Sequence, residues 1–209
     1  MEYRRGDRYM GKISANAVSA AMIISIVSYC NLVSQNSYVG AALFSFGLIV
    51  ICAYSMSLFT GMAGYITKTN VVPFLTATGI NCVTAFVFGV LGSLNPACKE
   101  RAAAVCAGKI DKGILWMFVS AVFCGVLIYL GVDFYKKRGS FIGILFAVPI
   151  FVVCGFDHTV ADLFYYGAAG NYRLEDILLL IAAILGNTLG SNIVRMLIYA
   201  GKNKEEQKV

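Results

Sequence analysis

The only histidine of the chain, His158, lies inside a long apolar run and has acidic residues on both sides. Asp157 directly precedes it, and Asp162 follows one helical turn later, within the apolar run Phe141–Tyr166. An ionisable side chain at membrane depth costs several kcal/mol and is a functional-site candidate by default. Imidazole titrates near neutral pH, so it can lend a proton to a passing ion or withhold one. The alternative is a histidine that only hydrogen-bonds to the backbone and holds an irregular segment together.

Two of the apolar runs contain an abrupt break with a glycine in it. The first break is 58–61 (LFTG), and the second is 155–158 (GFDH). A broken helix frees backbone N–H and C=O groups that lipid cannot satisfy, so a break must line a cavity in protein or water. Breaks at matching positions of two three-helix halves indicate a transport site, and half-helix N-termini there favour an anion. Thr60 is the polar side chain of the first break, so we expect it to lie opposite His158.

The composition indicates a membrane protein. Of the 209 residues, 59% are hydrophobic and only 13% are charged, with a mean hydropathy of +0.75. A soluble domain carries about 25% charged residues, because its surface faces water. Apolarity on all faces, rich in Gly and Ala, is typical of membrane helices rather than of barrel strands. The expected spans are Ile13–Val33, Tyr38–Ile66, Val71–Leu94, Gly113–Phe134, Phe141–Tyr166 and Ile177–Ala200.

These spans divide the chain into a cytoplasmic tail (1–12), a six-helix transmembrane channel domain (13–200) and a second cytoplasmic tail (201–209). Lysine and arginine are enriched on the cytoplasmic side of membrane proteins. With the N-terminus in the cytoplasm, 12 of the 17 basic residues fall inside and five outside. We therefore expect a multi-pass protein of the plasma membrane with both termini in the cytoplasm, as an even number of spans requires.

The segment 95–112 does not follow this charge rule. We expect it to be an outer loop, yet it contains four basic residues, including Lys109 and Lys112. It is either an ordinary solvated loop or a positive vestibule that concentrates anions at a pore mouth. The other basic residues fall in short clusters between apolar runs, so the net charge of +6 reports orientation and not binding to nucleic acid.

Metal and redox chemistry have few candidate ligands. The seven cysteines are scattered through apolar runs with no CxxC pair, and there is one histidine, so we expect no cofactor and no metal site. A disulfide between Cys98 and Cys106 stays open. A membrane enzyme is disfavoured, because no HExxH cluster and no nucleophile motif before a suitable turn is present.

Three motifs resemble the formate/nitrite transporter family. The runs 44–48 (FSFGL) and 58–61 (LFTG) look like its second helix and the loop that follows. The run 151–162 (FVVCGFDHTVAD) is similar to the fifth-helix signature, which usually reads GFEHS-x-AN. The run 185–190 (LGNTLG) resembles the sixth-helix GN-x-x-G motif. The resemblance spans about residues 13–200.

The resemblance implies an all-α membrane protein with an aquaporin-like protomer. Six transmembrane helices would form two inverted three-helix repeats, with helices two and five broken. Five copies would assemble into a homopentamer in the lipid bilayer, each protomer with its own pore. The implied substrate is a small monovalent anion such as formate, nitrite or hydrosulfide, carried alone or together with a proton.

The resemblance also suggests positions along the pathway. Phe44, Leu48 and Phe151 would form apolar constrictions, which exclude hydrated ions by dewetting. Thr60 would face the central His158. The remaining positions are Asn187 near the pore, and Lys109 or Lys112 as a vestibule lysine early in the fourth helix.

The chain departs from the family pattern at three positions. Ser57 replaces the acidic residue before LFT, Ser120 replaces an asparagine of the fourth helix, and Asp162 replaces the asparagine of the fifth-helix signature. Asp162 adds a negative charge near an anion path, unless it is protonated, paired or turned toward a basic loop. These departures bear on the substrate more than on the architecture.

Two other functions stay open. A neutral-solute channel for water, glycerol or ammonia would share the broken helices, but would need neither a basic vestibule nor a histidine at membrane depth. A purely structural protein would leave both breaks without a role.

Overall fold

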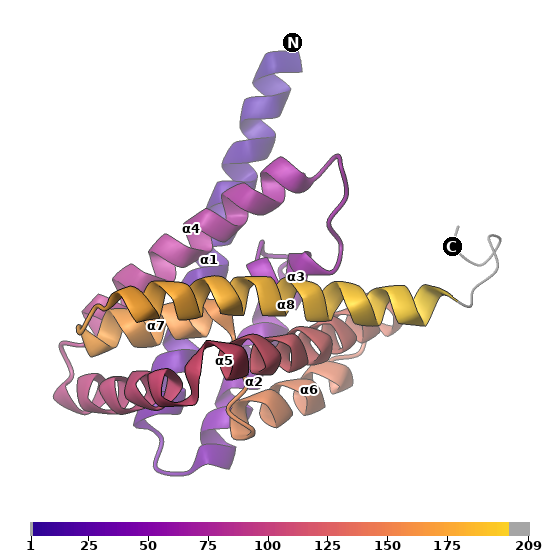
Figure 1. Ribbon diagram of the computed structural model, residues 1–209. Coiled ribbons are helices and arrows are strands. Elements are labelled where there is room, and N and C mark those ends of the chain that lie inside the picture. Colours follow the sequence, from indigo (N-terminus) through magenta and orange to yellow (C-terminus); the bar gives the residue numbers. More distant parts are fainter. Residues whose placement is uncertain (1, 201–209) are drawn as a thin grey trace.

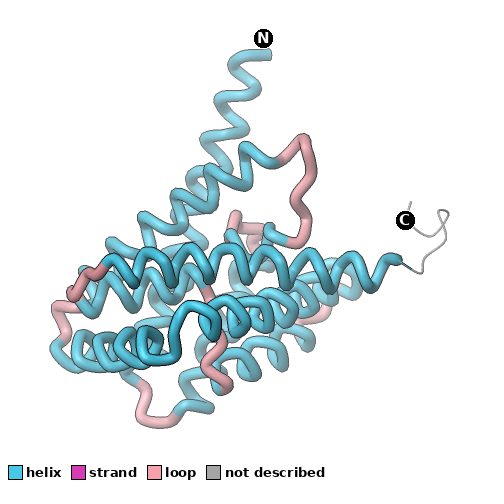
Figure 2. Tube along the Cα trace, in the orientation of Figure 1, coloured by secondary structure: helices cyan, strands magenta, loops and turns pink. Residues whose placement is uncertain are grey.

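The computed structural model describes residues 2–200, with side chains from residue 9 onward, and this part of the chain consists of helices and short connections (Figures 1 and 2). The first helix begins at Glu2, so most of the expected N-terminal tail is helical. The expected tail 201–209 lies outside the described residues. The helices are α1 (Glu2–Val33), α2 (Ser37–Ala53), α3 (Phe59–Ala63), α4 (Val71–Gly92), α5 (Pro96–Arg138), α6 (Ile142–Val153), α7 (Thr159–Ala169) and α8 (Leu174–Ala200).

Four of these helices are long and apolar enough to cross a bilayer, namely α1 from Tyr9, α4, α5 and α8. The apolar helices α2 and α6 have 17 and 12 residues. At 1.5 Å per residue they reach about 26 Å and 18 Å, short of a hydrocarbon core of about 30 Å. After each of them the chain leaves the helix for residues 54–58 or 154–158 and then continues as a second helix, α3 or α7. The two breaks predicted from the sequence are therefore present.

The segment 95–112 is a helix, so the expectation of a loop is wrong. Asn95 caps it, because its side chain accepts a hydrogen bond from the Ala97 N–H, and Pro96 occupies the first turn. Both residues are strong helix-start signals, and the Ala, Lys, Glu and Arg residues that follow are good helix formers. The charges of this segment suggested a solvated loop, but they do not lower its helix propensity.

A kink at Gly113 divides α5 into two helical parts. The backbone of Gly113 has φ 80° and ψ 170°, a conformation that is essentially restricted to glycine. The 43 residues of α5 would extend about 64 Å as a straight rod, twice the thickness of a bilayer core. The expected fourth span began at Gly113, and the kink shows why the apolar pattern starts there.

The helices pack in pairs that bring distant parts of the chain together. α5 lies along α8, and α4 lies along α7 and α1 (Figure 1). The approach of α5 and α8 is close, since a Cβ at Gly190 would lie 2.1 Å from the Val122 carbonyl oxygen. α2 packs against both α1 and α6. All eleven residues of α7 are buried, so the helix that follows His158 forms the centre of the molecule.

Candidate substrate pathway

The two breaks have the same backbone structure at a spacing of 100 residues. In the first break, the Met56 N–H donates to the Ile51 carbonyl at 2.9 Å. In the second, the Phe156 N–H donates to the Phe151 carbonyl at 2.9 Å. Ser55 (φ 52°) and Gly155 (φ 66°) both adopt the left-handed conformation. A left-handed residue commonly ends a helix. Each break therefore ends one half-helix in the same way and redirects the chain into the next one.

A buried asparagine holds each break in place. The Asn81 Oδ1 accepts the Phe59 N–H at 2.7 Å, and its Nδ2 donates to the carbonyls of Ala17 and Ser57 at 2.8 and 3.2 Å. The bonds to Phe59 and Ser57 satisfy backbone groups that the break removes from helical pairing, and the bond to Ala17 connects the break to α1. Asn81 is fully buried, so it acts inside the protein and not in water.

Asn187 performs the same function at the second break. Its Oδ1 accepts the Thr159 N–H at 3.0 Å and the Thr159 hydroxyl at 2.8 Å. Its Nδ2 donates to the carbonyls of Ala121 and Asp157 at 2.8 and 2.9 Å. The structure thus places Asn187 behind the break, where it fixes the residues on both sides of His158.

His158 and Thr60 meet between the two breaks. The His158 Nε2 lies 2.9 Å from the Thr60 Oγ1, and both residues are almost completely buried. His158 is also the N-cap of α7, where its Nδ1 accepts the Ala161 N–H at 3.2 Å. In a neutral imidazole only one nitrogen carries a hydrogen. Since Nδ1 accepts, the hydrogen is on Nε2, which donates to Thr60.

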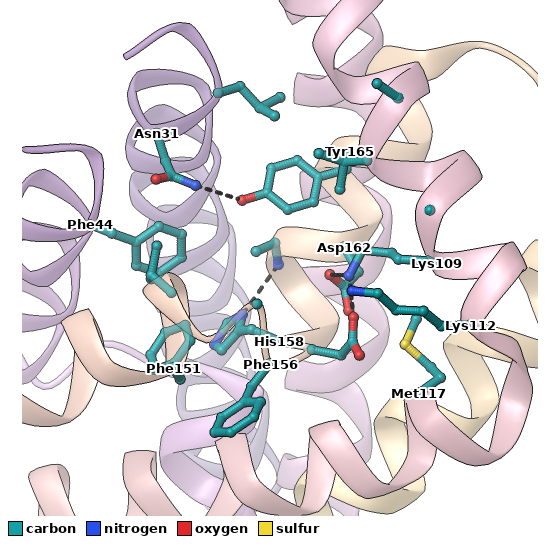
Figure 3. A pocket seen from close by; sticks show the side chains of 18 of the residues that line it. Asn31, Phe44, Lys109, Lys112, Met117, Phe151, Phe156, His158, Asp162 and Tyr165 are labelled. Carbon is teal, nitrogen blue, oxygen red and sulfur yellow. Dashed lines mark hydrogen bonds and ion pairs between the residues drawn. The ribbon is translucent and has the colours of Figure 1, made fainter. Parts of the chain in front are cut away.

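Two phenylalanines enclose the imidazole. The Phe151 ring stacks on His158 with centroids 5.8 Å apart and an interplanar angle of 13°. The Phe44 ring meets His158 edge to face at 6.1 Å and Phe151 at 5.7 Å (Figure 3). All three residues are at most 2% exposed. The predicted constriction residues Phe44 and Phe151 therefore surround the histidine directly.

Two cavities lie along α2, the first at Phe44 and the second from Leu48 to Cys52. The first, of about 320 Å³, is lined by Phe44, Phe151 and His158 together with Lys109 and Lys112. The second, of about 270 Å³, is lined by Leu48 and Leu58, and its one charged lining residue within the described chain is Lys136. We call them the lysine-pair cavity and the Lys136 cavity. Of the predicted pathway residues, Thr60 and Asn187 line neither cavity.

Lys109 forms ion pairs with two aspartates beside His158. Its Nζ lies 2.9 Å from the Asp162 Oδ1 and also donates to the Asp157 Oδ1. The Ser120 hydroxyl donates to the second oxygen of Asp157. The three charged groups are buried or nearly so, with Asp157 and Asp162 at 3% and 1% exposure. The kink of α5 and the helical conformation of 95–112 bring Lys109 to this position.

Several of these residues were not identified as site residues from the sequence. Asn81 and Asn187 each hydrogen-bond to the backbone of a break, but Asn81 lies in an apolar run with no break or motif to mark it. Leu58 and His158 occupy equivalent places as N-caps of α3 and α7. The spacing of 100 between Leu58-Phe59-Thr60 and His158-Thr159-Val160 is the signal that relates them, because the side chains differ too much for the equivalence to be seen directly.

The chain is similar in sequence to known transport proteins. Residues 6–201 match the sequence family described as "Formate/nitrite transporter". The chain is 30% identical over 190 residues to "Uncharacterized transporter YrhG" of Bacillus subtilis, covering 79% of this chain and 71% of the relative. It is 29% identical over 177 residues to "Formate channel BtFdhC" of Bacillus thuringiensis, covering 72% and 67%.

Solved structures share the fold. A structure described as "Pentameric formate channel with formate bound" superposes with a TM-score of 0.78 at 18% identity, covering 92% of this chain and 97% of that one. An "FNT family ion channel" superposes with a TM-score of 0.74 at 18% identity, covering 95% and 91%. The protein is a multi-pass membrane protein, and the chain belongs to the formate/nitrite transporter family.

Proposed function

We propose that the protein is a transmembrane channel for small monovalent anions of the formate, nitrite and hydrosulfide class. An anion would pass between the lysine-pair cavity and the Lys136 cavity through the constriction that Phe44, Leu48 and Phe151 form. One observation supports this proposal above the others. The imidazole of His158 and the hydroxyl of Thr60 are hydrogen-bonded to each other beside the rings of Phe44 and Phe151, which we propose as the barrier between the two cavities.

The barrier has a physical function in this proposal. Apolar rings exclude a hydrated ion by dewetting, and a bare anion at the bilayer centre pays a large desolvation cost. Hydrogen-bond donors at the barrier offset that cost. The Thr60 hydroxyl oxygen accepts the His158 Nε2–H. The hydroxyl hydrogen of Thr60 has no acceptor among the described residues, so this hydrogen would be able to bond to an anion. The positive end of α7, which begins next to His158, acts in the same direction.

His158 would act first as a hydrogen-bond donor to Thr60. To give a proton to a weak-acid anion through Thr60, the ring would first take up a second proton from cavity water and become imidazolium, so that it returns to neutral imidazole on donation. Donation of that proton turns the anion into its neutral acid, which crosses an apolar barrier at far lower cost. The second proton has to bind Nδ1, the nitrogen without a hydrogen, and it displaces the N-cap bond from the Ala161 N–H while it is bound. The neutral ring with its hydrogen on Nε2, facing Thr60, is thus the resting form from which this exchange would start.

The same proposal includes the arrangement in the membrane. The helices α1, α2–α3 and α4 would form one three-span repeat, and α5, α6–α7 and α8 an inverted second one, in an aquaporin-like protomer. The matched hydrogen bonds at the two breaks support this division. Both termini would lie in the cytoplasm of a plasma-membrane protein. The lysine-pair cavity would then open to the outside, and the Lys136 cavity to the cytoplasm.

We propose a homopentamer, by analogy with the pentameric formate channel that shares the fold. Large apolar side chains are exposed along most helices of the single chain, for example Phe46 on α2, Leu75 on α4 and Phe146 on α6. Exposed apolar area of this extent is covered by lipid or by a partner chain. Native mass spectrometry in detergent should give the mass of five chains.

Flux into proteoliposomes tests the function. Formate, nitrite and hydrosulfide should enter faster than into protein-free vesicles, whereas glycerol should not. Passage of glycerol without the anions would support the neutral-solute channel in place of this proposal. The variant His158→Phe should fold and assemble like the wild type but change the dependence of formate flux on pH. An unaltered pH profile in that variant would contradict the proton role of His158.

A further inference from the structure

The Lys109 cluster contains one cation and two carboxylates. Asp157 has partners on both oxygens, since Lys109 donates to Oδ1 and Ser120 to Oδ2. Asp162 has a partner on one oxygen only, because its Oδ1 pairs with Lys109 at 2.9 Å. Its Oδ2 is buried and has no hydrogen-bond partner among the described residues. The cluster is therefore one positive charge short of balance, and the deficit falls on Asp162.

A buried carboxylate oxygen without a donor loses its hydration and gains nothing in return. A proton on Oδ2 removes the unbalanced charge and also turns that atom from an acceptor into a donor. Asp162 lines the lysine-pair cavity beside His158 and Lys112, and Figure 3 shows it next to Lys109 at that cavity. Asp162 is therefore part of the cavity wall that an anion on its way to His158 would pass, and a protonated Oδ2 would turn toward an anion bound there.

We propose that Asp162 is the proton-holding residue of the lysine-pair cavity, which donates a hydrogen bond from Oδ2 to the anion and repels the anion when it ionises. The inference rests on the proposed function and adds how pH would regulate it. Anion binding in this cavity depends on a proton at Asp162. The cavity accepts anions at acidic and neutral pH and rejects them as the pH rises.

The family signature clarifies what the aspartate adds. An asparagine at position 162, as in the usual signature, is neutral at every pH and presents an N–H₂ donor from the same place. Asp162 provides a donor only while it is protonated. The departure from the signature thus converts a constant donor into one that responds to pH.

Other titratable groups face Asp162 and have to be distinguished from it. They come from α5, from the second break and from α7 itself, and Lys112 shares the same cavity. These groups are Lys109, Cys106, Cys124, Asp157, Tyr165 and Tyr166, with Asp176 of α8 beside Cys106 and Tyr166. Among them Asp162 is the one carboxylate of the Lys109 cluster with an unpartnered oxygen.

Formate flux across a pH series, with Asp162→Asn against Asp111→Asn, tests the inference. Asp111 is an exposed aspartate near Lys109 in sequence, so its variant removes the same charge without touching the cluster. Wild type and Asp111→Asn should lose flux at alkaline pH. One pH unit above the midpoint of the wild-type loss, Asp162→Asn should conduct about tenfold better than wild type, since only about a tenth of the aspartate is then protonated. An alkaline loss in Asp162→Asn equal to that of the wild type would overturn the inference.

Infrared difference spectroscopy tests protonation without flux. The carbonyl stretch of a protonated carboxylic acid should be present in the wild type and in Asp111→Asn at neutral pH and absent in Asp162→Asn. The band should shift when formate is added, because the O–H then donates to the anion. Absence of the band from the wild type would overturn the inference, even if formate flux is normal. A protein that carries no anion but shows the shifting band would contradict the channel function and leave the proton site standing.

Discussion

The contact between His158 and Thr60 shows how a single hydrogen bond can define a site. The N-cap bond from Ala161 occupies Nδ1, so the neutral imidazole presents its hydrogen at Nε2 and toward Thr60. The tautomer is thus determined by the local backbone, and not by the substrate. Without that cap, the imidazole could present either nitrogen to the pathway.

Removal of the Thr60 hydroxyl should impair transport. In Thr60→Val the Nε2–H loses its acceptor inside an almost dry site, which costs about 1–3 kcal/mol. Since 1.4 kcal/mol corresponds to a factor of ten, we expect formate flux to fall by about tenfold or more. Thr60→Ser keeps the hydroxyl and should retain most of the flux. Equal flux in the valine variant and the wild type would show that the hydroxyl takes no part.

Loss of the Asn81 amide should destabilise the protein. Asn81→Leu removes the side-chain partner of the Phe59 N–H and the Ser57 carbonyl at the first break and the bond to the Ala17 carbonyl of α1, and we expect a loss of about 2 kcal/mol or more in the free energy of unfolding. The exposed Asn171→Leu is the matched control. Denaturant titration in detergent measures both. A stability of Asn81→Leu equal to that of the control would mean that the first break does not depend on this side chain.

The sequence predicts the central pair of the site better than its surroundings. His158 and Thr60 stand out because each is a polar side chain at a break in an apolar run, where polar groups are costly unless they are paired. Asn187 was expected near the pore from its motif. In the structure its side chain instead hydrogen-bonds to backbone groups of the second break. Asn81 gives no such signal, because one amide in a membrane helix looks ordinary until its partners are known. The Lys109 ion pairs depend on the path of α5, which hydropathy does not describe.

At the scale of elements, the two breaks use one design with different residues. Ser55 and Gly155 both have positive φ, and only glycine adopts that conformation without steric cost. The first break therefore contains strain that the second one avoids. The backbone hydrogen bonds around Ser55 and Gly155 are equivalent, so a comparison of the two positions isolates the effect of backbone strain.

Exchange of the two residues should move stability in opposite directions. Gly155→Ser should lower the free energy of unfolding by about 1–2 kcal/mol, and Ser55→Gly should raise it by up to about 1 kcal/mol. A Cβ at Gly155 would have no other atom within 4 Å, so backbone strain is the dominant effect there. Thermal unfolding in detergent measures both shifts. A shift of the same sign in the two variants would contradict the strain argument.

Most helical elements follow from hydropathy, with one exception. The span 71–94 corresponds closely to α4, and the span 13–33 is the C-terminal part of α1, which begins at Glu2. Both broken spans are interrupted, the first at 54–58 and not at the expected 58–61, which is largely helical. The segment 95–112 was expected to be a loop, since its charges suggested solvent. Helix propensity and the Asn95 cap determine its conformation, and its Lys109 and Lys112 line the lysine-pair cavity.

At the scale of the whole molecule, the proposed orientation can be tested by labelling from outside. Tyr172 lies in the connection between α7 and α8, and Lys68 lies in the connection between α3 and α4. In intact cells, Tyr172→Cys should add reactivity toward a membrane-impermeant maleimide over the wild type, and Lys68→Cys should not. Permeabilised cells should label both. The reverse pattern in intact cells would place the termini outside.

The unequal lining of the two cavities has an electrical consequence. The Lys136 cavity has a cation and no carboxylate among its lining residues, while the lysine-pair cavity holds lysines and aspartates together. At a pH at which Asp162 is ionised, the charges of the lysine-pair cavity cancel, and anions should accumulate more readily at the Lys136 cavity. In a planar bilayer with equal formate on both sides, current should therefore rectify, with more charge carried when formate starts from the Lys136 side. Lys136→Gln should make the current–voltage curve more nearly linear. One side chain would then account for the rectification of a channel whose two breaks are otherwise similar.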